Sequence, residues 1–203
     1  MIRTGVYGGS FNPIHQGHVA LARHLVAQGL VDEVWLVVSP CNPFKVDSRL
    51  LDEQARLSLA RLAVEHEPDI DVSDIELFLP RPSYMSVTLR TLSARYAERQ
   101  FSLIIGADNW ERFHQWHEAD WIKEHYPLIV IPRPGHPLGE LPSGVQCADT
   151  PLMDIRSTWI RTRIPQPDYQ GEGLCPQVWE EIRSKGYYRR SLKQIIIRKT
   201  TTR

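Results

Sequence analysis

Cysteine is scarce in this chain of 203 residues. There are three cysteines, an odd number, and no two of them stand at the spacing of metal ligands. This pattern argues against a disulfide framework or a zinc finger and favours a reducing compartment, so we expect a cytoplasmic protein. The N-terminus lacks the apolar run of a signal peptide. No stretch approaches the ~18 apolar residues of a membrane span.

The chain also lacks a net charge, because 24 Lys and Arg residues balance 24 Asp and Glu residues. No overall field favours DNA or an anionic membrane, so we expect neither a nucleic-acid nor a membrane partner. Any anion site must therefore be local. The hydrophobic fraction of 42% is ordinary for a globular protein, and the length allows a sizeable core in one domain.

Short apolar runs of strand length alternate with segments that have helical periodicity. The runs end at Tyr7, Val38, Ile105 and Ile131. This alternation predicts an α/β fold with a mostly parallel sheet and helices on both faces. In such open sheets the ligand lies beyond the carboxyl ends of the strands, at a switch in strand order. We therefore expect the functional site where these four runs end.

The same patterns predict further elements. Helices are expected over 17–28, after a cap at Asp52, over 86–96 and over 176–185. In the helix after Asp52, residues Ala55, Leu59 and Leu62 share an apolar face. A strand is expected over 70–75, and the Gly- and Pro-rich stretch 135–150 is predicted to be a loop.

The most informative segment is GGSFNPIHQGH, residues 8–18, between the first predicted strand and the first helix. Gly8 and Gly9 carry no Cβ, so the backbone can approach a ligand closely. The helix that follows directs free N–H groups and a partial positive charge at the turn, which favours an anion. His15 and His18 face the same way and could stabilise phosphate oxygens that gain charge in a transition state.

Simpler interpretations of this segment exist. The glycines could merely shape a tight turn, with His15 and His18 on the surface. A two-histidine metal site is a second alternative, but no nearby carboxylate or cysteine completes it. The segment is not a Walker A loop, because the Gly-Lys-Ser/Thr ending is missing.

Residues 8–18 resemble the N-terminal signature of the nucleotidyltransferase superfamily that carries an H-x-G-H motif, here residues 15–18. The resemblance implies a Rossmann-like nucleotidyltransferase fold in which His15 and His18 are catalytic and bind the ATP phosphates. Asn12 stands where many members have Asp, at a position that mainly shapes the loop. The ATP site would also include Gly8, Gly9, Ser10 and Phe11.

Residues 154–161 resemble the second superfamily motif, I-S-S-T-x-I-R, with Arg156 in place of a Ser. Ser157 and Thr158 could cap a helix there, so that their hydroxyl and N–H groups meet the β- and γ-phosphates. Arg161 offers a planar, permanently charged fork that suits phosphate. On these residues alone, the pattern favours a plain helix cap with a solvated arginine.

Residues 104–116 are similar to the G-x-D-N-x-x-x-F-x-x-W segment of enzymes that use pyridine mononucleotides. Gly106 allows close approach at a strand end, and Asp108 can accept hydrogen bonds from ribose hydroxyls, so both are expected in the ATP site. Trp116 offers a flat face on which a pyridine ring can stack. The alternative for Trp116 is a core aromatic residue.

Residues 81–89 resemble the R-P-S-Y-T-x-D-T-L segment of the same family, in which the Tyr and the following backbone hold the nicotinate ring and carboxylate. This maps to Tyr84 and Met85. Met85 and Val87 replace the common Thr and Asp, so the choice between an acid and an amide substrate stays open.

Two further basic residues match the family pattern. Lys45, in the loop 39–45, would reach the phosphates, although an exposed loop lysine is equally consistent with the sequence. Arg133, in the R-P-G sequence 133–135, would hold the mononucleotide phosphate or a nearby loop.

Taken over residues 1–188, the chain resembles the nicotinate-nucleotide adenylyltransferase family, which implies one domain followed by a tail, 189–203, with no assigned role. The implied reaction joins the AMP of ATP to nicotinate mononucleotide and releases pyrophosphate. The implied cofactor is Mg²⁺ carried by ATP, without a protein metal cage. A homo-oligomer is left open. The alternatives are a sister enzyme with another acceptor, such as nicotinamide mononucleotide or phosphopantetheine, and a non-catalytic nucleotide-binding regulator.

Overall fold

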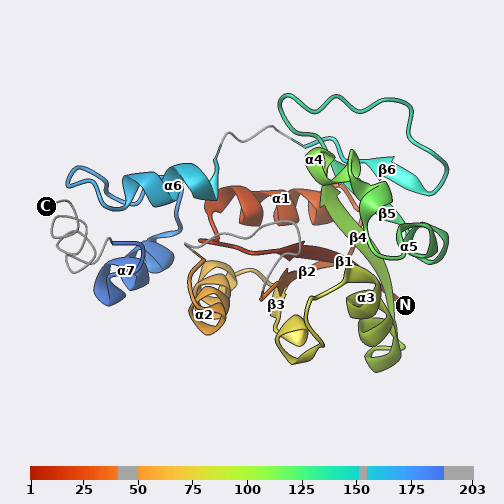
Figure 1. The fold of residues 1–203 in the computed structure, drawn as a ribbon, viewed down its shortest axis with the longest axis horizontal. Coiled ribbons are helices and arrows are strands. Elements are labelled where there is room, and N and C mark those ends of the chain that lie inside the picture. The colour runs from red at the N-terminus through yellow and green to blue at the C-terminus, as the bar shows by residue number, and fades with distance from the viewer. Residues whose placement is uncertain (41–49, 151–154, 190–203) are drawn as a thin grey trace, which may run out of the picture.

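The computed structural model describes residues 1–40, 50–150 and 155–189. Within these ranges, six strands form one fully parallel sheet in the order β3-β2-β1-β4-β5-β6 (Figure 1). The strands are β1 (Ile2–Gly9), β2 (Glu33–Val38), β3 (Ile70–Ser73), β4 (Arg99–Gly106), β5 (Leu128–Ile131) and β6 (Val145–Cys147). The strand order reverses between β1 and β4, which is where a doubly wound sheet binds its ligand.

Helices connect the strands in the predicted alternation. The α-helices are α1 (Gln16–Ala27), α2 (Glu53–Val64), α3 (Met85–Arg95), α4 (Ala107–Trp110), α5 (Ala119–His125), α6 (Ser157–Arg163) and α7 (Pro176–Lys185). Two 3₁₀ turns, η1 (Ile75–Phe78) and η2 (Phe113–Gln115), complete the described elements. In Figure 1, α6 and α7 gather at one end of the molecule, and β5 and β6 lie at the other. The expected α/β class and parallel sheet are confirmed.

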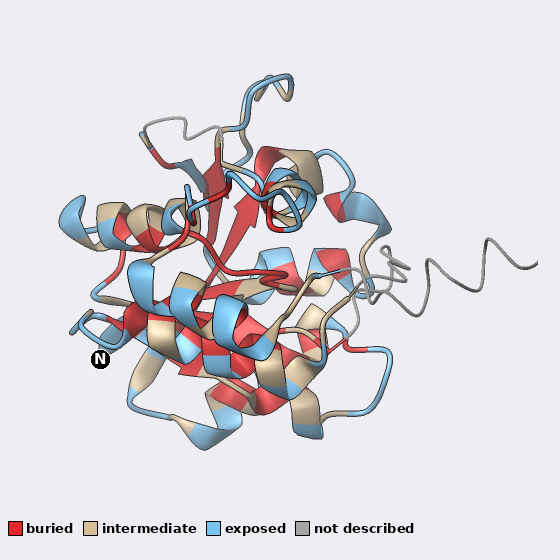
Figure 2. Ribbon diagram, turned by 90° about the vertical axis from the view of Figure 1, so that its left-hand side faces the viewer, coloured by how far each residue is buried: buried red, intermediate tan, exposed pale blue. Residues whose placement is uncertain are grey.

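The sheet separates two hydrophobic clusters, as expected for strands covered on both faces. Leu36 of β2 belongs to the cluster with residues of α1, α2 and α7. Its neighbour Val37 belongs to the other cluster, with residues of α3 and α5. Figure 2 shows the buried residues concentrated in the strands and on the inner sides of the helices. This two-sided burial explains why continuous apolar runs identified the central strands.

Two predicted boundaries are wrong. The strand expected over 70–75 ends at Ser73, and η1 follows it from Ile75. The stretch 135–150, predicted to be a loop, contains the edge strand β6. That strand has three residues, of which Val145 is the buried one, so it carries too little periodicity to be seen in the sequence.

The start of α2 follows the prediction, but its buried face does not. The Asp52 carboxylate accepts hydrogen bonds from Gln54 N at 3.0 Å and Ala55 N at 3.3 Å, which makes it the helix N-cap. Leu59 is fully buried as expected. Ala55 and Leu62 are only partly buried, whereas Arg56 is completely buried. The buried face of α2 is therefore rotated from the predicted one, and it includes the positively charged side chain of Arg56.

Among the described residues, no helix is long and apolar enough to cross a membrane. The division into one domain over 1–188 and a tail stays a prediction, and residues 190–203 lie outside the described part of the chain.

Candidate active site

A cavity of about 780 Å³ opens at the carboxyl ends of β1, β4 and β5. This volume lies within the usual range of small-molecule sites. Fourteen residues expected in the site line its wall: Gly8, Gly9, Ser10, Phe11, His15, His18, Met85, Gly106, Asp108, Trp116, Arg133, Ser157, Thr158 and Arg161. They come from segments far apart in the sequence, so the fold gathers the separate motifs into one place.

Two expected residues are not among those lining the cavity. Lys45 lies outside the described residues. Tyr84 stands just before α3 with its ring centroid 4.3 Å from that of His117, and it does not line the cavity wall. The next residue, Met85, does line the wall, and its Cε would lie 2.7 Å from a Cβ built on Gly8. The missing side chain of Gly8 therefore makes room for Met85.

The turn after β1 is held in an unusual backbone conformation. Phe11 has a φ of 42°, in the left-handed region that costs a bulky residue about 1–2 kcal/mol. Its ring makes edge-on contacts with Tyr7, at a centroid distance of 5.8 Å, and with His18, at 5.1 Å. These aromatic contacts help to fix the turn, but the strain requires further support from the surrounding structure.

The two histidines lie at the N-terminus of α1, with their rings in contact. His15 is the N-cap, and its ring stacks on that of His18 with the centroids 3.6 Å apart. The backbone N–H of His15 donates to Nδ1 of His18 at 3.2 Å. Because Nδ1 accepts this bond, a neutral His18 carries its proton on Nε2. A Cβ on Gly17 would lie 3.1 Å from Nδ1 of His15, so glycine leaves space for the stacked pair.

Both imidazoles are poor bases in this environment. Burial, reinforced by the positive charge of Arg133, lowers the pKa of His15 from 6.5 to about 4. Burial lowers the pKa of His18 well below its usual value too, with further contributions from His15 and Arg133. At neutral pH the pair is therefore uncharged. Each ring can donate one N–H bond to an anion without the repulsion that two imidazolium groups would suffer.

The depressed pKa of His15 predicts a loss of stability in acid. The unfolded chain binds a proton at His15 below about pH 6.5, and the folded chain does so only near pH 4, so protonation favours unfolding in that window. The free energy of unfolding should fall by about 2 kcal/mol more for the wild type than for His15→Asn between pH 7 and pH 4.5. Urea unfolding at both pH values measures this difference, and equal falls would contradict it.

Two side chains of α6 form hydrogen bonds with the backbone of the turn after β1. Nη1 of Arg161 donates to the carbonyl oxygen of Asn12 at 2.6 Å. Oγ of Ser157 donates to the carbonyl oxygen of Pro13 at 2.9 Å. The N-cap of α6 is Arg156, and Ser157 is the first helical residue, so the prediction that Ser157 and Thr158 cap this helix is wrong. The Ser157 hydroxyl already has a carbonyl partner across the site.

Two charged residues meet at the ends of β4 and β5. Nε of Arg133 lies 2.9 Å from Oδ1 of Asp108, and both side chains are partly exposed to the cavity. A Cβ on Gly106 would lie 2.5 Å from each of these two atoms. Real Cβ atoms do not approach so closely, so this ion pair depends on glycine at 106.

Several cavity residues were not predicted: Asn109, His24, His136 and Arg156. His24 lies on α1 seven residues after Gly17, so helical spacing from the histidine motif could have indicated it. Nδ1 of His136 lies 3.0 Å from Oε2 of Glu111. His136 follows the R-P-G sequence, and only the fold shows that its loop turns back to the cavity.

The sheet reversal, the strained turn and the histidine pair at a helix N-terminus define an α/β protein of the nucleotidyltransferase type. Residues 6–163 match the family model described as Cytidylyltransferase-like. The chain belongs to this family and, within it, to the nicotinate-nucleotide adenylyltransferases, as its similarity to curated relatives shows.

Two of these relatives carry the name "Probable nicotinate-nucleotide adenylyltransferase". The protein of Bacteroides thetaiotaomicron is 44% identical over 193 residues, which cover 94% of this chain and 95% of that protein. The protein of Bacteroides fragilis is 48% identical over 182 residues, covering 89% and 90%.

The solved structure of Plasmodium falciparum nicotinic acid mononucleotide adenylyltransferase complexed with NaAD has the same fold. Its TM-score is 0.76 at 17% identity, and the match covers 93% of this chain and 98% of that one.

Proposed function

We propose that this enzyme transfers AMP from ATP to nicotinate mononucleotide, giving nicotinate adenine dinucleotide and pyrophosphate in NAD biosynthesis. The observation that carries the proposal is the stacked pair of His15 and His18 at the N-terminus of α1, on the wall of a nucleotide-sized cavity. The curated names of relatives up to 48% identical support nicotinate mononucleotide as the acceptor.

The reaction is a direct in-line displacement. An oxygen of the acceptor's 5′-phosphate forms a bond to the α-phosphorus of ATP, and the bond from that phosphorus to the bridging β-oxygen breaks. Pyrophosphate takes the electron pair and leaves. The attacking phosphate is already ionised, so neither a covalent enzyme intermediate nor a strong general base is needed. Catalysis rests on positioning and on stabilisation of charge.

The described residues suit these roles. The Nε2–H of His18 is a preformed donor for an α-phosphate oxygen, and His15 stacks beside it. Arg161 and Ser157 line the cavity from α6 and are proposed to stabilise the departing pyrophosphate. Lys45 is proposed for the same leaving group on the sequence resemblance alone. Gly8, Gly9, Ser10, Phe11 and Thr158 also line the cavity and are proposed to bind ATP.

On the acceptor side, Trp116 and Met85 supply the apolar wall for a pyridine ring. Arg133 is proposed to bind the mononucleotide phosphate, and its neighbour Asp108 is proposed to accept hydrogen bonds from the ribose of ATP. Because these two side chains form an ion pair with each other, each fixes the direction of the other before ligand arrives. Tyr84 is proposed to approach the nicotinate group from the start of α3.

The donor set fits Mg²⁺ that arrives with ATP. Among the described residues, no group of three or more His, Cys, Asp or Glu side chains could hold a metal ion. Of the described residues that line the cavity, only Asp108 carries a carboxylate, and it faces Arg133. Magnesium favours phosphate and water oxygens in such a setting, and it would neutralise charge on the triphosphate.

We also propose a cytoplasmic location from the cysteine content, whereas a homo-oligomer stays a prediction.

Replacing Trp116 with alanine should weaken the acceptor selectively. Loss of the stacking face should raise the KM for nicotinate mononucleotide roughly tenfold and leave the KM for ATP within about twofold. Steady-state pyrophosphate release with each substrate varied in turn measures both constants. Trp121→Ala is the matched control, because Trp121 packs against His125 and Arg90 outside the cavity. Equal effects of the two substitutions on the acceptor KM would contradict this role.

The acceptor is tested by pyrophosphate release from ATP and Mg²⁺ with nicotinate mononucleotide, nicotinamide mononucleotide and phosphopantetheine in parallel. We expect strong turnover with the nicotinate form. Preference for the amide would keep the chemistry but overturn the acceptor. No release with any of the three would overturn the proposed function and favour a nucleotide-binding regulator.

A further inference from the structure

The turn that carries the proposed phosphate-binding motif is also held by residues that do not line the cavity. The strained φ of Phe11 shows that this turn does not adopt its conformation without external restraint. Arg161 and Ser157 restrain it from the cavity side. Two other residues, Arg56 and Tyr188, also bind this turn and do not line the cavity.

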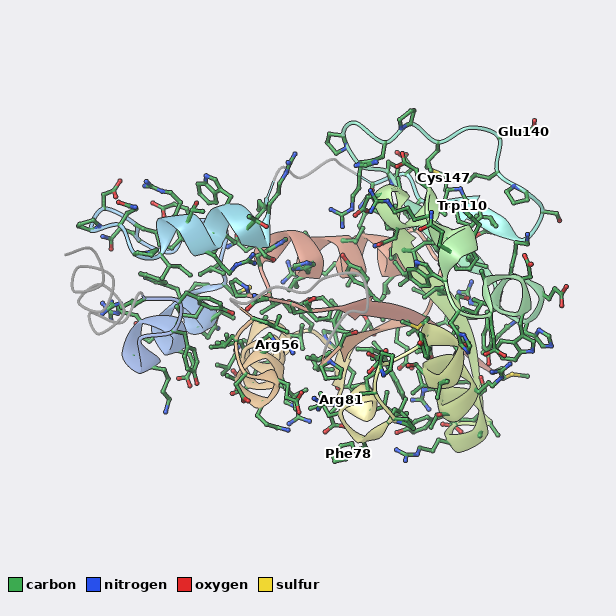
Figure 3. All side chains as sticks on the ribbon, viewed as in Figure 1. Arg56, Phe78, Arg81, Trp110, Glu140 and Cys147 are labelled. Atoms are coloured by element: carbon green, nitrogen blue, oxygen red, sulfur yellow. The ribbon has the colours of Figure 1, made fainter. Side chains whose placement is uncertain are left out.

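Arg56 connects three segments through their backbone carbonyl oxygens. Its Nη1 donates to Ser10 at 2.5 Å and to Ser39 at 2.8 Å. Its Nη2 donates to Pro40 at 3.2 Å, and its Nε donates to Leu51 at 2.9 Å. The side chain thus links the turn after β1, the end of β2 and the residue before the cap of α2. Figure 3 shows Arg56 between α2 and the sheet.

Burying a guanidinium is costly unless its N–H groups are bonded. Arg56 is completely buried within the helix face that otherwise packs on the core. An apolar residue would fill that place at less cost, so its four carbonyl contacts indicate a positioning function that the core alone does not require.

Tyr188 supplies the second restraint from the far end of the described chain. Its hydroxyl donates to Oδ1 of Asn12 at 2.9 Å, and the same oxygen accepts from the N–H of Leu51 at 3.1 Å. The side-chain oxygen of Asn12 is therefore held by Tyr188 and Leu51, and its carbonyl oxygen is held by Arg161. Arg56 and Tyr188 are both absent from the residues that line the cavity.

The geometry points to Arg56 and Tyr188 as positioning residues that preform the phosphate-binding turn over 10–12 for ATP. They touch neither substrate; they fix the backbone that does. This inference rests on the proposed use of ATP, but not on the identity of the acceptor. It predicts that weakening either residue reduces ATP affinity more than acceptor affinity.

The test compares two site variants with two controls of similar chemistry. Arg56→Lys keeps the charge but cannot span the carbonyl groups, and Leu59→Ala damages the same helix at a fully buried apolar residue. Tyr188→Phe removes one hydroxyl, and Tyr169→Phe removes another, which donates to Glu172 O at 2.7 Å away from the turn. Calorimetry of ATP binding without acceptor, KM for both substrates and the melting temperature are measured for each.

We expect ATP binding to weaken roughly tenfold in Arg56→Lys and about three- to fivefold in Tyr188→Phe, with the acceptor KM within about twofold. The controls should lower the melting temperature without weakening ATP binding. Site variants that lose only thermal stability, or controls that weaken ATP equally, would overturn the inference. If Arg56→Lys does not fold, Tyr188→Phe against Tyr169→Phe decides alone. Because ATP binding is measured without acceptor, failure of the proposed acceptor leaves this test intact.

Discussion

His18→Ala should lower turnover by about 10²- to 10³-fold. The cost of losing one preorganised donor to a developing oxyanion is of that order. The Nδ1 of His18 accepts a bond from the His15 backbone, so the neutral ring carries its proton on Nε2. The effect should fall on kcat, because the donor acts on charge that appears in the transition state.

The matched control is His125→Ala. His125 is exposed, stacks on Trp121 and lies outside the cavity, so its loss should leave turnover within about twofold of the wild type. Pyrophosphate release measured under saturating substrates compares the two variants. If His18→Ala retained more than about a tenth of wild-type turnover, the histidine would not carry the chemistry assigned to it.

Gly106→Ala should reduce kcat/KM by about 10²-fold without unfolding the protein. The added methyl group would stand 2.5 Å from Nε of Arg133 and from Oδ1 of Asp108, so both side chains must move. Since they are partly exposed, they can swing into the cavity, and the fold survives while their ion pair is lost. Displacement of substrate-orienting groups by about 1 Å has costs of this size.

Gly139→Ala provides the control for this substitution. Gly139 has no atom within 4 Å of the built Cβ, and its φ is not positive, so alanine is accommodated there. Activity close to wild type is expected for Gly139→Ala, with a melting temperature near that of Gly106→Ala. If Gly106→Ala kept wild-type kcat/KM, the paired arrangement of Arg133 and Asp108 would be irrelevant to catalysis.

The central strands and the histidine motif could be predicted because their signals are local. The run Val34–Val38 is apolar throughout, as a strand buried on both faces must be, and β2 covers it. His15 and His18 were expected to face the same way from their spacing, and their rings stack. The anion site predicted over residues 8–18 from the glycines and the helix that follows stays a prediction.

Other features depend on contacts between distant segments, which a single sequence does not encode in a readable way. Nothing near Asn12 indicates that Tyr188 will donate to its side chain. An arginine on an amphipathic helix is usually solvated, so the burial of Arg56 reversed the expected pattern. The cap predicted at Ser157 failed because its hydroxyl finds the Pro13 carbonyl oxygen, from a segment far away in the chain.

The central claim is that the AMP of ATP passes to nicotinate mononucleotide on this enzyme. The most direct test incubates the purified protein with nicotinate mononucleotide and Mg²⁺, using ATP labelled at the α-phosphate in one reaction and at the γ-phosphate in another. We predict that the α-label appears in nicotinate adenine dinucleotide and the γ-label in pyrophosphate, in equal amounts. An α-label that stays in ATP, ADP or free AMP, with no labelled dinucleotide, would contradict the account.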